Sequence, residues 1–229
     1  MPRLQVESVT VGYGGTPVVL DLDLAVPDGA VTTIVGPNGC GKSTLLRTMA
    51  RLLTPTAGRV LLDGEPVHAV ATREVARRLA LLPQGPVAPD GLLVRDLVGR
   101  GRHPHQRWFR QWSPEDERAV EAALELTDTA DLRDRPLDRL SGGQRQRAWL
   151  AMTLAQDTDL LLLDEPTTYL DLAHQVEVLD LVTRLNRERG RTVVMVLHDL
   201  NLAARCSDHL VVMKDGVIAA EGGPHAVLT

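Results

Sequence analysis

The sequence contains only two cysteines among its 229 residues, Cys40 and Cys206, and their spacing matches no metal-binding motif. A disulfide-stabilised scaffold is therefore excluded, and a reducing, cytosolic compartment is the simple interpretation. Basic residues are not in excess either. The 25 Lys and Arg against 30 Asp and Glu give a formal net charge of −5, which gives no support to general nucleic-acid binding.

Long apolar runs are also absent. No window approaches about eighteen uninterrupted apolar residues, the length that a membrane-spanning helix needs. The first residues lack the apolar core of a signal peptide, so we expect the chain to stay in the compartment where it is made. A hydrophobic content of 44% with 24% charged residues is ordinary for a globular chain, and the length is sufficient to bury a full core.

A glycine-rich segment at residues 36–44 directly follows the β-branched run of residues 31–35. This order predicts a strand, a tight loop and a helix whose unpaired N–H groups bind phosphate. Lys42 is expected to reach the β- and γ-phosphates, and the Ser43 hydroxyl to hold Mg²⁺. The alternative is a turn without a ligand, but the strand and helix around it favour a nucleoside triphosphate. The predicted nucleotide contacts are Gly36, Pro37, Asn38, Gly39, Cys40, Gly41, Lys42, Ser43 and Thr44.

Two further apolar runs end in residues that suit phosphate chemistry. Residues 160–163 are four leucines, as expected for a parallel strand buried on both faces, and they lead into Asp164 and Glu165. Asp164 suits Mg²⁺, and Glu165 is free to polarise a water. Residues 193–197 lead into His198, for which we expect a γ-phosphate contact. An ordinary strand exit and a structural histidine are the alternatives, which the phosphate loop makes less favourable.

A fourth segment, L-S-G-G-Q at residues 140–144, opens a stretch of helix-forming residues with Ser141 as N-cap. Alone it predicts only a capped turn. Together, the four segments make the chain resemble the ATP-binding cassette (ABC) ATPases from end to end. The resemblance implies a P-loop NTPase (RecA-like) α/β core, an antiparallel β-subdomain and an inserted helical subdomain.

The resemblance also implies roles for individual residues. Tyr13 matches the aromatic that stacks on adenine, and Gln84 the glutamine that touches Mg²⁺ and water and senses the membrane partner. Asp171 matches the aspartate that communicates across the dimer. The signature residues then face the γ-phosphate bound by the opposite subunit of a homodimer, so one chain supplies half of each ATP site. These signature residues are Ser141, Gly142, Gly143 and Gln144.

A single ABC ATPase domain is expected over residues 1–229. Residues 1–85 and 156–229 are assigned to the core and β-subdomain, because residues 4–26 alternate like half-exposed antiparallel strands and residues 60–66 resemble a strand that turns at Asp-Gly. Residues 86–155 are assigned to the helical signature subdomain, where S-P-E-D at 113–116 predicts a capping box with proline at the first helical position. Members of this family usually continue beyond the point at which this sequence stops.

Several segments resemble importers of iron–chelate complexes, with cobalamin and haem importers as close alternatives. They are residues 101–105 (G-R-H-P-H), 147–156 and 166–171, the last of which contains Tyr169. The histidines at 103 and 105 are a weak metal motif without a third ligand. The resemblance implies integral membrane permease subunits, an indirect link to a solute-binding protein, no nucleic-acid partner and a peripheral position on the cytoplasmic face of the membrane.

Two other classes of ABC protein fit less well. DNA-repair and chromosome-structuring ATPases carry a long coiled-coil insertion or zinc cysteines, and translation factors carry two cassettes; this sequence shows neither. Cys40 has two interpretations, a reactive thiolate favoured by Lys42 and the helix N-terminus, or a small loop residue with its sulfur in the core.

Overall fold

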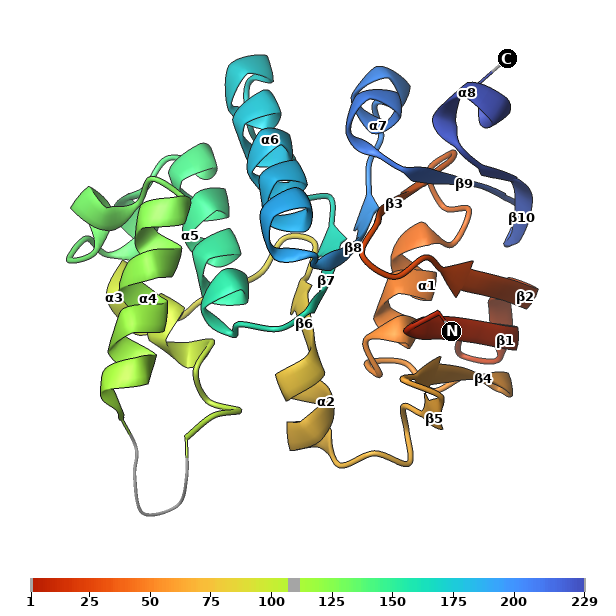
Figure 1. The fold of residues 1–229 in the computed structure, drawn as a ribbon, viewed down its shortest axis with the longest axis horizontal. Coiled ribbons are helices and arrows are strands. Elements are labelled where there is room, and N and C mark those ends of the chain that lie inside the picture. The colour runs from red at the N-terminus through yellow and green to blue at the C-terminus, as the bar shows by residue number, and fades with distance from the viewer. Residues whose placement is uncertain (1, 107–111, 229) are drawn as a thin grey trace.

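The computed structural model describes residues 2–106 and 112–228, in which two β-sheets flank a central helix (Figure 1). The smaller sheet has the strand order β2-β1-β4-β5 and is antiparallel throughout. The alternation of apolar and polar residues in this region predicted such half-exposed strands. The strands are β1 (Leu4–Tyr13), β2 (Thr16–Val26), β4 (Ala57–Leu62) and β5 (Glu65–Pro66).

The larger sheet has the order β10-β9-β3-β8-β7-β6. Its strands pair in parallel from β9 to β6, and only the β9–β10 hairpin is antiparallel. The predicted strands at residues 31–35, 160–163 and 193–197 are its three inner parallel strands. The strands are β3 (Val31–Val35), β6 (Leu79–Leu82), β7 (Leu160–Asp164), β8 (Thr192–Val196), β9 (His209–Lys214) and β10 (Val217–Gly222).

The four leucines of β7 show why this sheet is buried on both faces. Leu160 and Leu162 belong to a hydrophobic cluster that joins both sheets to helix α1 (Lys42–Met49). Leu161 and Leu163 point the other way, into a cluster built largely by helices. Because successive side chains in a strand alternate between faces, a run with no polar residue needs apolar partners on both sides.

Helices fill the second layer and one end of the molecule. Figure 1 shows α3, α4 and α5 gathered beside the large sheet, away from the small one, with α6 and α7 nearer the sheet. Ser113 and Asp116 form the predicted capping box at the start of α4, with Pro114 as its first residue. The helices are α2 (Thr72–Arg78), α3 (Val94–Arg100), α4 (Pro114–Leu126), α5 (Gly142–Ala155), α6 (Leu172–Arg189), α7 (Leu200–Cys206) and α8 (Pro224–Val227), with 3₁₀ turns at Ala130–Leu132 and Leu137–Arg139.

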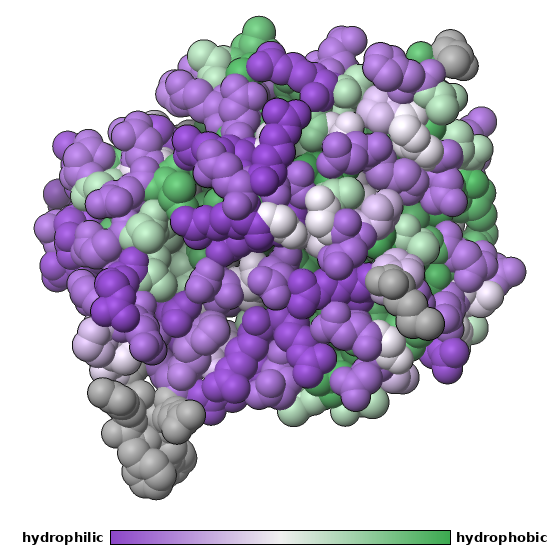
Figure 2. All heavy atoms as spheres, viewed as in Figure 1, coloured by the Kyte–Doolittle hydropathy of each residue, from purple (hydrophilic) through white to green (hydrophobic). Residues whose placement is uncertain are grey.

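This arrangement confirms the predicted fold class, a parallel α/β core with an antiparallel sheet and a helical region. Hydrophilic residues cover most of the face shown in Figure 2, with scattered hydrophobic groups between them. In the described ranges, no helix has the length and apolar character needed to cross a bilayer.

Candidate functional site

The phosphate loop connects the buried strand β3 to α1, as the sequence predicts. Its glycines are required by the backbone geometry. Gly36 has a φ of 147°, and a Cβ there would lie 2.1 Å from the backbone oxygen of Met213 in the neighbouring strand β9. Gly41, just before α1, has a φ of 106°. Residues with a side chain rarely adopt these φ values, so the loop depends on glycine.

Lys42 and Ser43 begin α1 and turn toward the loop and the sheet. The Lys42 ammonium is buried and donates to the backbone oxygens of Gly36 and Pro37, at 2.8 and 2.9 Å. A buried cation needs such partners, and phosphate oxygens would offer the same donors a stronger, charged acceptor. Ser43 Oγ donates to Asp164 Oδ1 at 2.7 Å. This bond joins the loop to the carboxyl end of β7.

Asp164 has the chemistry of a metal ligand. Its carboxylate is buried, and burial raises its pKa. The hydrogen bond from Ser43 and the positive charge of nearby Arg47 lower the pKa and offset part of this increase. Arg47 Nε lies 4.0 Å from Oδ2. Within residues 2–106 and 112–228, Oδ2 has no hydrogen-bond donor. An unpaired buried carboxylate oxygen beside a serine hydroxyl fits Mg²⁺, which prefers oxygen ligands.

Glu165 and His198 lie against each other. Glu165 Oε1 is 2.7 Å from His198 Nε2, and Thr168 Oγ1 donates to the other Glu165 oxygen at 3.1 Å. The backbone of Glu165 has a φ of 54°, in the left-handed region. A non-glycine residue there is uncommon, and such strain is often found at functional sites. The geometry holds a carboxylate and an imidazole together at the ends of β7 and β8.

One cavity of about 480 Å³ brings these groups together. Its walls come from the phosphate loop, from Gln84 after β6, and from Glu165 and His198. Segments far apart in the sequence therefore meet where the parallel strands end, the usual position of ligand sites in such sheets. The predicted residues that line it are Asn38, Gly39, Gly41, Lys42, Ser43, Thr44, Gln84, Glu165 and His198.

The remaining predicted residues lie outside these walls. Tyr13 is about half exposed at the end of β1. Cys40 is 6% exposed and belongs to the hydrophobic cluster around α1, with Sγ turned toward Gly36, which favours its structural interpretation. His105 Nε2 contacts the backbone oxygen of Gln156 at 2.8 Å, and the described residues contain no group of three metal-ligating side chains.

The signature segment begins α5. Ser141 and Gln144 form a capping box, in which Ser141 Oγ accepts from the Gln144 N–H and the Gln144 side chain accepts from the Ser141 N–H. One turn further on, buried Gln146 donates to the backbone oxygen of Pro166 at 3.1 Å. This bond ties α5 to the loop that carries Glu165. The signature residues do not line the cavity of their own chain.

Three of these features were not predicted. Arg47 beside Asp164 was readable in the sequence, because it follows Ser43 by one helical turn. Val18 lines the cavity from the small sheet, and the Gln146 bond reaches across twenty residues. The latter two depend on packing between distant segments, which a single sequence does not disclose.

Fold and site together define a P-loop ATPase cassette. The ABC transporter family model matches residues 19–168. The probable siderophore transport system ATP-binding protein YusV of Bacillus subtilis is 57% identical over the whole chain and 83% of its own length. The ferric enterobactin transport ATP-binding protein FepC of Escherichia coli is 52% identical over 99% of this chain and 84% of its own. The chain belongs to the ABC transporter family.

Solved structures agree with this assignment. A dimeric bacterial ABC transporter cassette superposes with a TM-score of 0.87 at 27% identity, covering 96% of this chain and 98% of that one. The same cassette in a dimeric post-hydrolysis state, bound to ADP and phosphate, gives 0.85 at 27% identity over the same shares. A putative metal-chelate type ABC transporter in an inward-facing conformation gives 0.85 at 29% identity, covering 100% of this chain and 86% of that one.

Proposed function

We propose that this chain is the ATP-hydrolysing subunit of an ABC importer that takes up ferric siderophores. The observation that carries the ATPase assignment is the cavity in which Lys42, Ser43, Gln84, Glu165 and His198 meet. A phosphate loop, a polarising carboxylate and a metal-binding aspartate are the groups that phosphoryl transfer to water requires.

The geometry supports a role for each side chain in hydrolysis. Glu165 accepts a proton from, and orients, the water that attacks the γ-phosphate, and His198 fixes the carboxylate through its 2.7 Å contact. Lys42 exchanges its loop carbonyls for phosphate oxygens and stabilises the charge that develops on them. Ser43 and Asp164 would hold Mg²⁺, with Gln84 beside them, and the ion would neutralise phosphate charge when bound.

The substrate class rests on the relatives. Proteins named for achromobactin, petrobactin, iron(3+)-hydroxamate and ferric enterobactin transport are all 52–54% identical to this chain. A cobalamin import protein of Halobacterium salinarum is 44% identical over 99% of this chain. The common feature of the more similar proteins is an iron–siderophore cargo, so cobalamin and haem are the second candidates for the cargo of this chain.

The position of the signature segment supports the proposed assembly. Since residues 141–144 lie outside the cavity of their own chain, they are available to a second copy. We propose a homodimer with two ATP sites, each made of the phosphate loop of one chain and the signature helix of the other, with Tyr13 against adenine. Residues 86–155 would form the helical subdomain that docks on permease subunits at the cytoplasmic face of the membrane. A solute-binding protein would deliver the cargo to those permease subunits.

An uptake experiment tests the proposal. In a strain lacking this chain, the wild type should restore uptake of radiolabelled iron bound to a siderophore, whereas Lys42→Ala should not. Arg187→Gln, an exposed position on α6, serves as the matched control and should restore uptake. Restored uptake of labelled cobalamin without any effect on iron–siderophore uptake would contradict the proposed substrate.

A further inference from the structure

A second cavity, of about 430 Å³, lies on the helical side of the molecule. It is bordered by the turn after α3, by α4, by the end of α5 and by the segment that leads from α6 into β8. Arg191 lies directly before β8, so this cavity adjoins the amino ends of the parallel strands. The nucleotide cavity lies at their carboxyl ends, and the two cavities share no lining residue.

Arg191 is one of two buried arginines that line this cavity, with Arg102. Its side chain is 7% exposed, and Nη2 donates to Asp157 Oδ1 at 2.6 Å, although that carboxylate is 59% exposed. In the described part of the chain this is the one hydrogen bond of its guanidinium, which carries five N–H donors. Burial lowers the pKa of Arg191, and nearby Arg189 acts in the same direction against the opposing effect of Asp157. A largely buried guanidinium with free donors favours an added anion.

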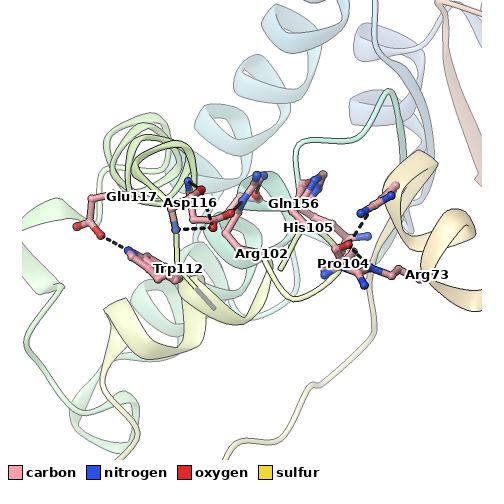
Figure 3. Close-up of polar contacts among 11 residues, drawn as sticks. Arg73, Arg102, Pro104, His105, Trp112, Asp116, Glu117 and Gln156 are labelled. Carbon is pink, nitrogen blue, oxygen red and sulfur yellow. Dashed lines mark hydrogen bonds and ion pairs between the residues drawn. The ribbon is translucent and has the colours of Figure 1, made fainter. Parts of the chain in front are cut away.

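Arg102, by contrast, is structural. It donates to Asp116 Oδ1 at 2.8 Å and to the backbone oxygen of Ala155 at 2.9 Å, which joins α4 to α5. Figure 3 shows Arg102 between Asp116 and Gln156, with His105 beside Gln156. Gln156 Nε2 in turn donates to the backbone oxygens of Ala76 and Leu79. These bonds fix one wall of the cavity before any ligand arrives.

The remaining charges of the lining favour an anion. With Arg102 paired to Asp116 and Arg191 to Asp157, the lining retains two exposed arginines, Arg118 and Arg189, against one carboxylate, Glu115. This excess of positive charge contrasts with the formal net charge of −5 for the whole chain. These two exposed guanidinium groups can approach an oxyanion held by Arg191.

Part of the cavity lining is apolar. Buried Ala123 and Leu154 and half-buried Leu126 supply this apolar part of the lining, and the cavity volume is in the range of small-molecule sites. We propose that this cavity binds a small organic anion, with its phosphate or carboxylate group on Arg191, Arg118 and Arg189 and its apolar part on the alanine and leucine side chains. Such a ligand would join α4 to the α6–β8 segment, away from ATP.

Methyl NMR on the full chain tests this site. A non-hydrolysable ATP analogue with Mg²⁺ first fills the phosphate loop, and phenyl phosphate, benzoate and phenol are then titrated. The alanine methyl signals of Ala119, Ala122 and Ala123 should shift saturably with either anion and much less with phenol. A higher affinity for phenyl phosphate than for benzoate identifies a phosphate ligand, and a higher affinity for benzoate identifies a carboxylate ligand. The affinity should fall as salt is added.

Variants connect the shifts to the arginines. Arg191→Gln should weaken binding by about tenfold or more, the usual effect of losing a charge-assisted hydrogen bond. Because this change could also unfold the chain, exposed Arg118→Gln and Arg189→Gln serve as independent variants and should each weaken binding by about threefold. Arg187 lies two residues from Arg189 but lines a different cavity, so Arg187→Gln should leave binding unchanged.

Three results would overturn the proposal. They are the absence of saturable shifts, equal affinity for phenol and the anions, and equal weakening by Arg187→Gln and Arg189→Gln. Saturable binding of an acidic peptide without binding of either small anion would assign the cavity to a protein partner instead.

Discussion

Individual backbone positions set the shape of the phosphate loop. Gly36 combines a φ of 147° with the close approach of the Met213 oxygen from β9, so a side chain there has no room. Gly36→Ala should lower the free energy of unfolding by about 1–3 kcal/mol and weaken ATP binding, since the loop must move. Gly223→Ala, where a Cβ would meet no atom within 4 Å, is the control. Chemical denaturation and nucleotide titration of both variants decide the matter; equal behaviour would contradict the steric argument.

Cys206 makes stability depend on pH in the alkaline range. Burial raises the pKa of its thiol from 9.0 to about 11. Between these two pKa values the thiol of the unfolded chain loses its proton and that of the folded chain keeps it. The contribution of Cys206 to the free energy of unfolding is therefore fully present below about pH 9 and is lost as the pH rises toward 11. Since one pKa unit corresponds to about 1.4 kcal/mol, the wild type should lose about 2 kcal/mol more than Cys206→Ala between about pH 8 and pH 10.5. Denaturant titration of both proteins at both pH values measures this difference, and equal losses would refute it.

The sequence alone pointed to all but one of the residues that line the cavity at the phosphate loop. Glycine spacing, a leucine run ending in Asp164 and Glu165, and the strand before His198 each have local signals. It did not predict their contacts. The 2.7 Å approach of Glu165 to His198 and the hydrogen bond from Ser43 to Asp164 depend on how β3, β7 and β8 pack side by side. Those distances come from tertiary structure.

Helices α4 and α5 both begin with a capping box, so matching substitutions can separate stability from activity. Ser113 caps α4 and Ser141 caps α5, each within a capping box. Replacing either serine by alanine should cost about 1 kcal/mol of stability. Only Ser141→Ala should also lower ATP hydrolysis, because only this cap lies in the proposed signature segment. Thermal unfolding and steady-state ATPase rates of the two variants test this, and an equal loss of activity would show that α5 matters only for stability.

Elements were predictable to different degrees. The strands of the small sheet, strands β3, β7 and β8 of the large sheet and helix α4 follow from alternation, apolar runs and the S-P-E-D cap. The order of strands did not follow, because β6 pairs with β7 across a gap of 77 residues that holds most of the helical region. The sequence also contained no sign of the second cavity, since its arginines come from the turn after α3, from α4, from α6 and from the residue before β8.

In the proposed assembly each chain presents half of each ATP site, so ATP should bring two copies together. Glu165→Gln should elute as a monomer without nucleotide and as a dimer with Mg-ATP in gel filtration, because hydrolysis no longer releases the dimer. Ser141→Arg in the same background should prevent the shift by placing bulk and charge at the interface. A wild-type ATPase rate per molecule that does not change with protein concentration would contradict a shared site.

The hydrolysis of ATP by Glu165→Gln tests the assignment of the catalytic carboxylate most directly. The substitution keeps the size of the side chain that contacts His198 and Thr168 but removes its ability to accept a proton. We expect single-turnover hydrolysis of bound Mg-ATP to fall by about a hundredfold or more, while the affinity for ATP stays close to that of the wild type. A rate near that of the wild type, with ATP bound normally, would contradict the role given to Glu165 and the site built around it.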